Sequence, residues 1–394
     1  CSYKNYTALR IVDYIGPSNV LKGLYFEWCK ILFINNAEYL DFYNYGLKYE
    51  DLINSGFTLI MKKEIIIPNH FEPFEKKNVD INFMVPSLIK KKFRVFVIDN
   101  LYSGKKTNLI KSKNLVFIKE NILNKKAISR KLKKEKIYAV FHLAAMADIV
   151  PSIINPEKYM DTNVMGTTKI LEIAREKKVK KFIYIASSSC YGIPKKYPTK
   201  EDSRINCEYP YALSKNLGEQ ITLHWKKIYK MNCNSIRLFN VYGPRSRTSG
   251  TYGAMFGTFL AQKISGSPLT IVGSGKQSRD FTYVSDVIDA MIKASKSKIK
   301  FGVFNVGSGR TISVNYIVKL IGGKTVKIPK RPGEPFITYA NITKINKILN
   351  WKPRIRIEKG IEILIKNIHY WKKAPVWTPI KIKNATKKWF KYIK

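Results

Sequence analysis

The chain has 394 residues, enough for two or three domains with a large buried core, and its hydrophobic content of 45% is ordinary for a globular protein. Lys and Arg outnumber Asp and Glu by 71 to 28, so the formal net charge is +43. No apolar run reaches about 18 residues, so we predict no membrane span.

Two interpretations of the positive charge are open. One is a surface that binds nucleic acid. The other is a compositional bias toward Lys, Ile, Asn and Tyr throughout the chain. We favour the bias and expect no nucleic-acid partner, because the basic residues form no single block and accompany no nucleic-acid motif.

The cysteines and histidines argue against disulfide and metal frameworks. Five scattered cysteines, an odd number, indicate a reducing compartment, and we expect a cytoplasmic protein. Four histidines and no Cys/His cluster predict no metal site. There is no signal peptide, and the start at Cys1 leaves open that the chain is a fragment.

Residues 1–85 read as a segment of their own. The pattern predicts strands at 8–15 and 37–43, a helix at 20–35, and a short helix that ends at Gly56. Further strands are expected at 58–67. This order, with the sequence LINSGF, resembles the C-terminal half of a GNAT-type acyltransferase without the half that carries its acyl-CoA phosphate loop. We therefore expect an inactive remnant or a docking segment.

From Ser87 onward, strands alternate with helical patterns, which predicts an α/β fold with a doubly wound parallel sheet. The strand at 93–100 ends in an acid, Asp99, of the kind that binds the adenosine ribose in dinucleotide-binding folds. Such folds place a first strand and a glycine-rich turn about twenty residues before that acid. Residues 79–87 contain no glycine, and Pro86 should interrupt a helix there. We expect that first strand and turn to be missing or replaced.

The stretch from Lys181 to Lys215 carries the chemistry. An apolar strand at 182–185 is followed by three serines: Ser187, Ser188 and Ser189. Tyr211 and Lys215 stand four apart, one turn from each other on a helix. An ammonium near a phenol favours the phenolate, so such a tyrosine can act as a base. A lone Tyr-x-x-x-Lys is usually a solvated helix face, but the serine-rich strand end changes that interpretation.

The remaining third contains three further motifs. A buried strand leads into Asn240 and a turn, and residues 273–284 read GSGKQSRDFTYV. We interpret the two glycines of that stretch as a hairpin turn rather than a cofactor loop. The loop 331–335 reads RPGEP, a helix is expected at 357–366, and the basic tail 374–394 is expected as a surface helix.

These motifs together resemble the extended short-chain dehydrogenase/reductases, specifically the NAD-dependent nucleotide-sugar epimerase/dehydratase family of UDP-glucose 4-epimerase-like enzymes, over about residues 87–390. The resemblance implies a Rossmann-like NAD domain at 86–240 and a smaller substrate-binding α/β part at 241–394, interleaved with the sheet. It also implies a nucleotide sugar, in particular a UDP-sugar, as substrate. A homodimer through two helices beside the active site is expected.

The resemblance also assigns roles to residues. Tyr211 would take a proton from a sugar hydroxyl, Lys215 would lower the pKa of Tyr211 and hold the nicotinamide ribose, and Ser187 would share the hydrogen bond to the sugar. The other implied cofactor-binding residues are Asp99, Asn100, Asn121, Ile122, Leu143, Ala144, Ala145 and Asn163. The implied substrate-binding residues are Ser188, Ser189, Asn240, Arg279, Arg331 and Glu334.

The three serines favour one reaction. Dehydratases of this family carry Thr-Asp-Glu in their place, and UDP-glucuronate decarboxylases carry Glu at the position of Ser189; serines cannot supply those carboxylates. We therefore predict epimerisation at C4 of a UDP-hexose through a transient 4-keto sugar. A dehydratase or decarboxylase is the alternative within the family. A fragment that binds nucleotide sugar without holding NAD is the alternative of another class.

Overall fold

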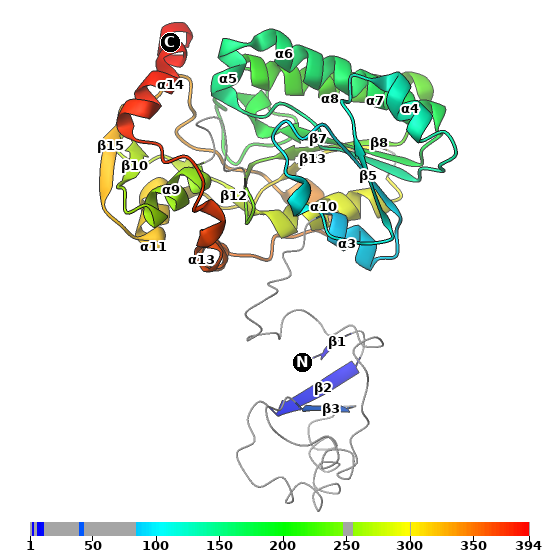
Figure 1. Cartoon of the computed structure of the whole chain (residues 1–394), viewed down its shortest axis with the longest axis horizontal. Helices are drawn as coiled ribbons and strands as arrows, with labels where there is room; N and C mark the ends of the chain where they lie inside the picture. The colour runs from blue at the N-terminus through cyan, green and yellow to red at the C-terminus, as the bar shows by residue number, and fades with distance from the viewer. Residues whose placement is uncertain are drawn as a thin grey trace, which may run out of the picture. The chain divides into compact units, whose positions relative to one another are not determined.

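The computed structural model describes residues 84–246, 255–299 and 301–393, with three strands before residue 43 (Figure 1). The chain divides into two compact units, Cys1–Asp80 and Ile81–Lys394.

The first unit is described only at three strands, β1 (Ser2–Tyr3), β2 (Tyr6–Ile11) and β3 (Tyr39–Phe42). Strand β2 pairs with β1 antiparallel and with β3 parallel. The strands predicted at 8–15 and 37–43 are thus present with shifted ends. The other elements predicted before residue 84 lie outside the described residues, and the likeness to an acyltransferase is not confirmed.

The second unit is built on parallel strands. Four of them form a sheet in the order β13-β8-β7-β6, and two more form a separate pair, β4-β5. Every pairing in these two pieces is parallel. The predicted α/β class with a parallel, Rossmann-like sheet is confirmed. The strands are β4 (Val95–Asp99), β5 (Leu115–Lys119), β6 (Ala139–His142), β7 (Lys181–Ser187), β8 (Cys233–Leu238) and β13 (Phe301–Val306).

Helices cover both faces of this sheet because β7 is apolar on both faces. Its alternate residues enter two cores: Phe182 and Tyr184 point to one, and Ile183 and Ile185 to the other. Figure 1 shows the first set of helices along one side, α4 (Lys125–Lys131), α5 (Ile149–Ile154), α6 (Pro156–Met160), α7 (Gly166–Glu176) and α8 (Pro210–Tyr229). On the other side are α3 (Met84–Lys90), α10 (Val284–Lys296) and α12 (Thr343–Leu349).

The first strand of such a fold is absent among the described residues. Doubly wound sheets have the strand order 3-2-1-4-5-6, and here β5-β4 and β6-β7-β8 match that order with position 1 empty. Strand β7 is buried along its whole length, but β4 and β6 are mostly half-buried. The expectation that Pro86 interrupts a helix is wrong, because Pro86 is the third residue of α3, where a missing N–H costs nothing.

The C-terminal part adds three short strand pairs and a third core, centred on Tyr242, Phe281 and Trp371. Strand β9 (Asn240–Tyr242) pairs with β12 (Phe281–Tyr283), β10 (Leu269–Val272) with β15 (Thr325–Ile328), and β11 (Ser278–Arg279) with β14 (Ile312–Ser313). Its helices are α9 (Met255–Ile264), α11 (Val314–Ile321), α13 (Ile357–Lys366) and α14 (Pro379–Tyr392), and the 3-10 helices of the unit are η2 (Lys106–Asn108), η4 (Ser188–Tyr191) and η5 (Ile368–Trp371).

The predicted hairpin at Gly273 and Gly275 is wrong. Both glycines have positive φ, +59° and +74°, as a turn requires. The strands on either side of the turn do not pair with each other, however, because β10 pairs with β15 and β11 pairs with β14. The turn therefore carries the chain from one strand pair to the next.

Helix α8 lies close to β7 at Gly218. A Cβ atom at this position would lie 2.3 Å from the Tyr184 hydroxyl and 2.9 Å from the carbonyl oxygen of Asn163. The same Tyr184 hydroxyl donates a hydrogen bond to the carbonyl oxygen of Lys215, 3.0 Å away. The absence of a side chain at Gly218 thus sets how closely the helix that carries Tyr211 approaches the sheet.

We expect Gly218→Ala to lower the free energy of unfolding by about 1–3 kcal/mol through overpacking, although alanine favours a helix by about 1 kcal/mol. Urea unfolding measures this change. Gln220→Ala, at an exposed position of the same helix, is the control and should change the free energy of unfolding by less than about 0.5 kcal/mol. An unchanged or higher stability of Gly218→Ala would contradict the close packing described here.

Candidate active site

The chain leaves β7 through a serine turn. Ser187, the last residue of β7, accepts a hydrogen bond from the backbone N–H of Ser189 at 3.2 Å and donates one to its hydroxyl at 2.9 Å. These bonds start η4, as a side-chain cap does for a helix. Ser187 is buried, and Ser188 and Ser189 are half-buried. The three predicted serines therefore lie together at the carboxyl end of a central strand.

Tyr211 reaches the same place from α8. Proline at the first position of this helix suits a helix start, and Tyr211 follows directly. Burial raises the pKa of Tyr211, and the nearby Ser187 hydroxyl lowers it. The nearby Asp148 carboxylate raises it. The structure thus brings Ser187 and Tyr211 together, as the sequence predicts.

Tyr209 belongs to this group, although sequence reasoning missed it. Its ring stacks on that of Tyr211, with centroids 6.5 Å apart and an interplanar angle of 5°. Burial raises its pKa, and the nearby Ser189 side chain lowers it. Two tyrosines and two serines therefore form adjoining hydroxyl pairs. The Tyr-Pro-Tyr sequence at a helix start was the available signal.

Lys215 occupies a different environment from the one expected. Its ammonium lies over the ring of Tyr184, 4.5 Å from the centroid. Burial lowers its pKa to about 7, and Glu219 acts in the opposite direction. We expected Lys215 to lower the pKa of Tyr211. In this structure the group that lowers the Tyr211 pKa is the Ser187 hydroxyl.

A buried ion pair connects the elements that carry the site. Glu219, one turn after Lys215 on α8, pairs with Arg237 of β8 at 2.5 Å, and both side chains are buried. Arg237 also donates a hydrogen bond to the Tyr191 hydroxyl at 2.8 Å. The pair therefore ties α8, β8 and η4 together. We did not single out these residues from the sequence, although Arg237 stands three residues before Asn240 in the strand motif.

Asn163 connects helix α8 to the turn that follows β6. It lies in a π-helical turn, η3 (Asp161–Met165), a local distortion that is frequent at functional sites. Its amide nitrogen donates to the carbonyl oxygen of Met146 and to the Ser214 hydroxyl, both at 2.9 Å, and its oxygen accepts from the N–H of Met146 at 2.7 Å. These bonds connect α8 to the turn after β6. That turn contains the predicted residues Leu143, which is exposed, and Ala144 and Ala145, which are half-buried.

His142 is a packed strand-end residue, as the sequence indicates. It is 4% exposed, its Nε2 lies 2.9 Å from the Thr167 hydroxyl oxygen, and burial lowers its pKa to about 3. It is therefore neutral near pH 7.

The residues predicted for the adenosine end of NAD stand at the carboxyl ends of β4 and β5. Asp99 accepts a hydrogen bond from the N–H of Leu101 at 2.6 Å, and Asn100 accepts one from Tyr102 at 3.0 Å. Asn121 accepts from the N–H of Leu123 at 3.0 Å, and the next residue, Ile122, is buried in the core.

The fit to NAD is therefore uneven along the cofactor. Asp99, the acid expected to bind a ribose, is the last residue of β4, and Tyr211 and Lys215, expected at the nicotinamide end, stand on α8. The part of the site for the middle of NAD differs. The sequence has no glycine between Gly56 and Gly104, and the described residues contain no first strand that a glycine turn could follow. The cradle that normally binds the pyrophosphate at a helix N-terminus is absent from the described part of the chain.

The predicted substrate residues gather around one loop. The Arg331 guanidinium pairs with Glu334 at 2.9 Å. Arg279 donates to the carbonyl oxygen of Phe336 at 3.2 Å; burial lowers its pKa, and Glu334 raises it. Asn240 accepts a hydrogen bond from the Thr338 hydroxyl at 2.8 Å. The structure therefore brings Arg279, Arg331 and Glu334 together and links Asn240 to the same loop.

Helix α14 is the surface helix expected for the tail, and its Trp389 also reaches this loop. Trp389 is 1% exposed, and its indole N–H donates to the carbonyl oxygen of Pro332 at 2.8 Å. Its ring lies 6.2 Å from that of Tyr209 and 5.4 Å from the Arg331 guanidinium. Trp389 thus joins the arginine loop to the tyrosines. The spacing of the buried Ile382, Thr386 and Trp389 was the available signal.

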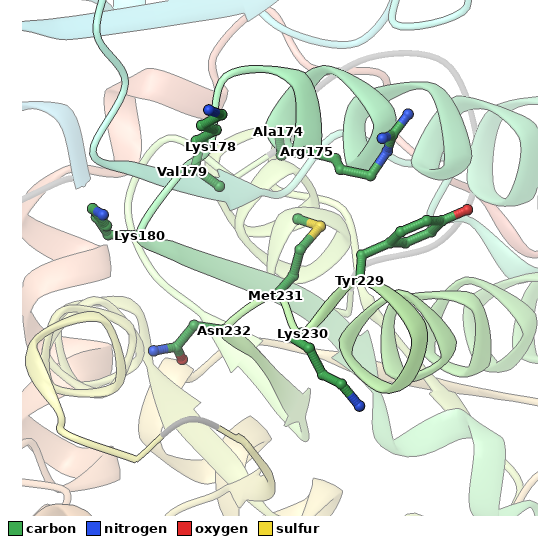
Figure 2. A pocket seen from close by; sticks show the side chains of 9 residues that line it. All are labelled: Ala174, Arg175, Lys178, Val179, Lys180, Tyr229, Lys230, Met231 and Asn232. Atoms are coloured by element: carbon green, nitrogen blue, oxygen red, sulfur yellow. The ribbon is translucent and has the colours of Figure 1, made fainter.

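A separate pocket of about 330 Å³ lies near the amino ends of β7 and β8 (Figure 2). It is lined in part by basic side chains, and none of the predicted site residues contributes to it. The lining residues are Ala174, Arg175, Lys178, Val179, Lys180, Tyr229, Lys230, Met231 and Asn232. We assign it no part in the chemistry.

Among the residues that the structure describes, no helix combines the length and apolarity needed to cross a bilayer. The same residues hold no cluster of three His, Cys, Asp or Glu side chains placed to bind a metal ion.

Comparison with known proteins places this site in a family. The model of the NAD dependent epimerase/dehydratase family matches residues 82–307. A UDP-glucuronate 4-epimerase from Thermodesulfobacterium geofontis is 32% identical over 291 residues, 70% of this chain and 88% of that protein. The crystal structure of UDP-glucose 4-epimerase with UDP-glucose from Thermotoga maritima matches with a TM-score of 0.69 and 30% identity, over 74% of this chain and 94% of that one. UDP-glucuronic acid 4-epimerase from Bacillus cereus, in complex with UDP-glucuronic acid and NAD, matches with a TM-score of 0.66 and 30% identity, over 73% and 94%.

The buried ammonium of Lys215 predicts a pH-dependent stability. Its pKa falls from 10.5 in the unfolded chain to about 7 in the fold. The folded state therefore carries the full cost of the buried charge below pH 7, and this cost disappears as the pH rises from 7 toward 10.5. Lys215→Met should raise the melting temperature most at pH 6–7, and the difference should shrink toward pH 10. Thermal melts without added ligand measure it, with exposed Lys227→Met as the control for lost charge. A difference that grows with pH would contradict the assignment.

Proposed function

Because the chain belongs to the NAD dependent epimerase/dehydratase family, we propose that it epimerises a UDP-hexose at C4 through a transient 4-keto sugar, with NAD as its cofactor. The observation that carries this proposal is the hydroxyl pair of Ser187 and Tyr211 at the end of β7. Relatives and solved structures named as UDP-sugar 4-epimerases support it.

In the proposed reaction, Tyr211 takes the proton from the C4 hydroxyl and later returns it. Ser187, whose hydroxyl lies near Tyr211, would hold the same sugar oxygen, so the proton would move within a short chain of hydroxyls. Bound NAD supplies the acceptor and donor for the hydride at C4. Epimerisation results when the ketone presents its other face before the hydride returns.

We assign the two ends of NAD to two different groups of residues. Lys215 would bind the nicotinamide ribose, because its ammonium is buried over the Tyr184 ring and has too few polar partners to stay fully charged. Asn163 would hold the turn after β6 in place for the cofactor. The remaining proposed contacts are Asp99 and Asn100 with the adenosine ribose, Asn121 and Ile122 with the adenine, and Leu143, Ala144 and Ala145 along the cofactor.

The substrate would lie between the two halves, residues 86–240 and 241–394. Arg279 and Arg331 are the proposed ligands of the diphosphate, since a guanidinium matches phosphate oxygens in pairs. Glu334, paired with Arg331, would bind the nucleotide ribose. The sugar would lie against Ser188 and Ser189, with Asn240 at the diphosphate.

Epimerisation is favoured over the other reactions of the family. Elimination and decarboxylation need acid and base groups beside the ring, and η4 offers the hydroxyls of Ser188 and Ser189. A fragment that binds nucleotide sugar without NAD is the second candidate, and the lack of a pyrophosphate cradle among the described residues favours it.

We also propose a homodimer formed through α7 and α8. Leu213 on α8 and Met165, just before α7, are 41% and 49% exposed, an unusual setting for large apolar side chains beside a functional site. Sedimentation equilibrium tests this proposal. Leu213→Lys should shift the protein toward the monomer, and an unchanged monomer in both proteins would sink it.

The full chain with millimolar NAD should interconvert UDP-glucose and UDP-galactose. Chromatography of the nucleotide sugars measures this conversion. Tyr211→Phe should lower kcat by about 10²–10⁴-fold, because the proton acceptor is lost, and should keep UDP binding in calorimetry. Tyr209→Phe is the matched control, since it removes a neighbouring hydroxyl and keeps the stacked ring. UDP-sugar binding without turnover at saturating NAD would support the non-catalytic alternative, and a dehydrated product would replace epimerase with dehydratase.

A further inference from the structure

Helix α14 connects two parts of the second unit. At its start, the Thr378 hydroxyl accepts a hydrogen bond from the N–H of Lys381 at 3.3 Å, and Pro379 suits the first helical position. The buried side chain of Ile382 packs with Ile328 of β15. The helix, red in Figure 1, also lies against α5. It therefore joins the β10–β15 pair to the helices that cover the main sheet.

A buried amide fixes the segment that leads into α14. Gln262 on α9 is fully buried and donates a hydrogen bond to the carbonyl oxygen of Trp377 at 2.7 Å and another to the Thr270 hydroxyl at 2.9 Å. Its side-chain oxygen accepts from the N–H of Thr270 at 3.1 Å. Both amide donors and the oxygen are thus bonded, as a buried amide requires. The helix consequently starts from a defined point of the fold.

The other end of α14 packs on the loop 331–335. Trp389 is 1% exposed, and its indole N–H donates a hydrogen bond to the carbonyl oxygen of Pro332 at 2.8 Å. Gly333 has a φ of +69°, and a Cβ atom at this position would lie 2.6 Å from Cγ2 of Ile393. The loop and the end of the helix are therefore in direct contact at two successive residues.

The indole of Trp389 also contacts the guanidinium of Arg331. The guanidinium carbon lies 5.4 Å from the ring centroid, within the ~6 Å range of a cation–π contact, which is strongest for tryptophan. Arg331 pairs with Glu334 at 2.9 Å, and these two side chains are only 16% and 20% exposed. Stacking fixes the plane of a guanidinium without using its N–H donors, which can match phosphate oxygens in pairs. The orientation of Arg331 is therefore set by Trp389 together with Glu334.

A second arginine makes this place positive. Arg279 donates to the carbonyl oxygen of Phe336 at 3.2 Å, just after the loop. Burial lowers the pKa of Arg279, the Glu334 carboxylate raises it, and the charge of Arg331 lowers it. The charges of two guanidinium groups and the carboxylate of Glu334 sum to a positive charge, which attracts a phosphate group.

The other neighbour of Trp389 is Tyr209. Their ring centroids are 6.2 Å apart, and Tyr209 stacks on Tyr211 with centroids 6.5 Å apart. A single aromatic ring thus separates Trp389 from the proposed proton acceptor. The indole therefore contacts the arginine proposed at the diphosphate and adjoins the tyrosines proposed at the sugar.

From these contacts, we infer that α14 is part of the substrate site and that Trp389 is a positioning residue, which orients Arg331 for the diphosphate of the nucleotide. Trp389 acts through Arg331 and needs no contact of its own with the substrate. The identity of the ligand as a UDP compound rests on the proposed function; the stacking of Trp389 on Arg331 does not.

Titration of the full chain with UDP in calorimetry tests this role. Trp389→Phe removes the indole N–H and should raise the Kd of UDP about fivefold to tenfold, because Arg331 loses its stacking partner and Pro332 its hydrogen bond. Trp371→Phe is the matched control. Trp371 is also fully buried, but its indole N–H has no hydrogen-bond partner among the described residues, and the third core around it includes none of the proposed site residues. This variant should change the Kd of UDP by less than about twofold, since separate sites act independently.

A double-mutant cycle separates positioning from general packing. Arg331→Lys keeps the charge but removes the flat group that stacks on an indole. In the Arg331→Lys background, Trp389→Phe should change the Kd of UDP by less than about twofold. A merely structural role of Trp389 would give the same factor in both backgrounds. Trp389→Tyr repeats the series if Trp389→Phe does not fold.

Tryptophan fluorescence supplies an independent readout. Binding of a diphosphate to Arg331 changes the electric field at the stacked indole, so UDP should change the emission of the wild-type chain. The same change should appear in Trp371→Phe and should be lost in Trp389→Phe. An equal change in both variants would overturn the contact between Trp389 and the nucleotide-binding arginine.

The outcomes separate this role from the proposed function. An unchanged UDP affinity in Trp389→Phe, or an equal loss in both backgrounds, overturns the positioning role. Absent UDP binding by the wild-type chain overturns the positioning role together with the proposed substrate. UDP binding with the expected coupling, but without epimerisation of UDP-sugars, leaves the role of Trp389 standing and refutes the proposed function.

Discussion

The constraint on which this structure depends is the backbone pairing of a parallel sheet. A strand buried between two layers of helices has no water for its N–H and C=O groups, so both of its neighbours must be present. Strand β7 meets this condition: it pairs with β6 and β8, and it is buried along its length. Ser187, the proposed catalytic serine, is its last residue, so a strand paired on both sides positions it.

The other half of the site depends on the contact between α8 and β7. Gly218 lets the helix approach, the Tyr184 hydroxyl bonds to its backbone, and the Glu219–Arg237 pair joins it to β8. A buried ion pair adds little net stability, but loss of one partner leaves an uncompensated charge. These contacts hold α8 against the sheet and so limit how far the Tyr211 and Ser187 hydroxyls can separate.

The sequence predicts the parts of the site that rest on local patterns. The apolar run 182–185 and the Tyr211–Lys215 spacing define a strand end and a helix face, because periods of two and of about 3.6 residues show directly in a sequence. The contacts that depend on distant segments were not accessible in this way. Trp389 meets Tyr209 across 180 positions of the chain, and the preference of β10 for β15 over a hairpin appears only in the folded sheet.

The pKa shifts belong to the same class of property. Spacing places Lys215 one turn from Tyr211, but spacing does not report how deeply the ammonium is buried. In the fold, Glu219 also pairs with Arg237, so Lys215 receives only part of the compensation that a buried cation needs, and its pKa falls to about 7. Polar ligand groups close to Lys215 would restore its charge, and a charged Lys215 would then favour the phenolate of Tyr211. The proposed role of Tyr211 as a base would therefore depend on a filled cofactor site.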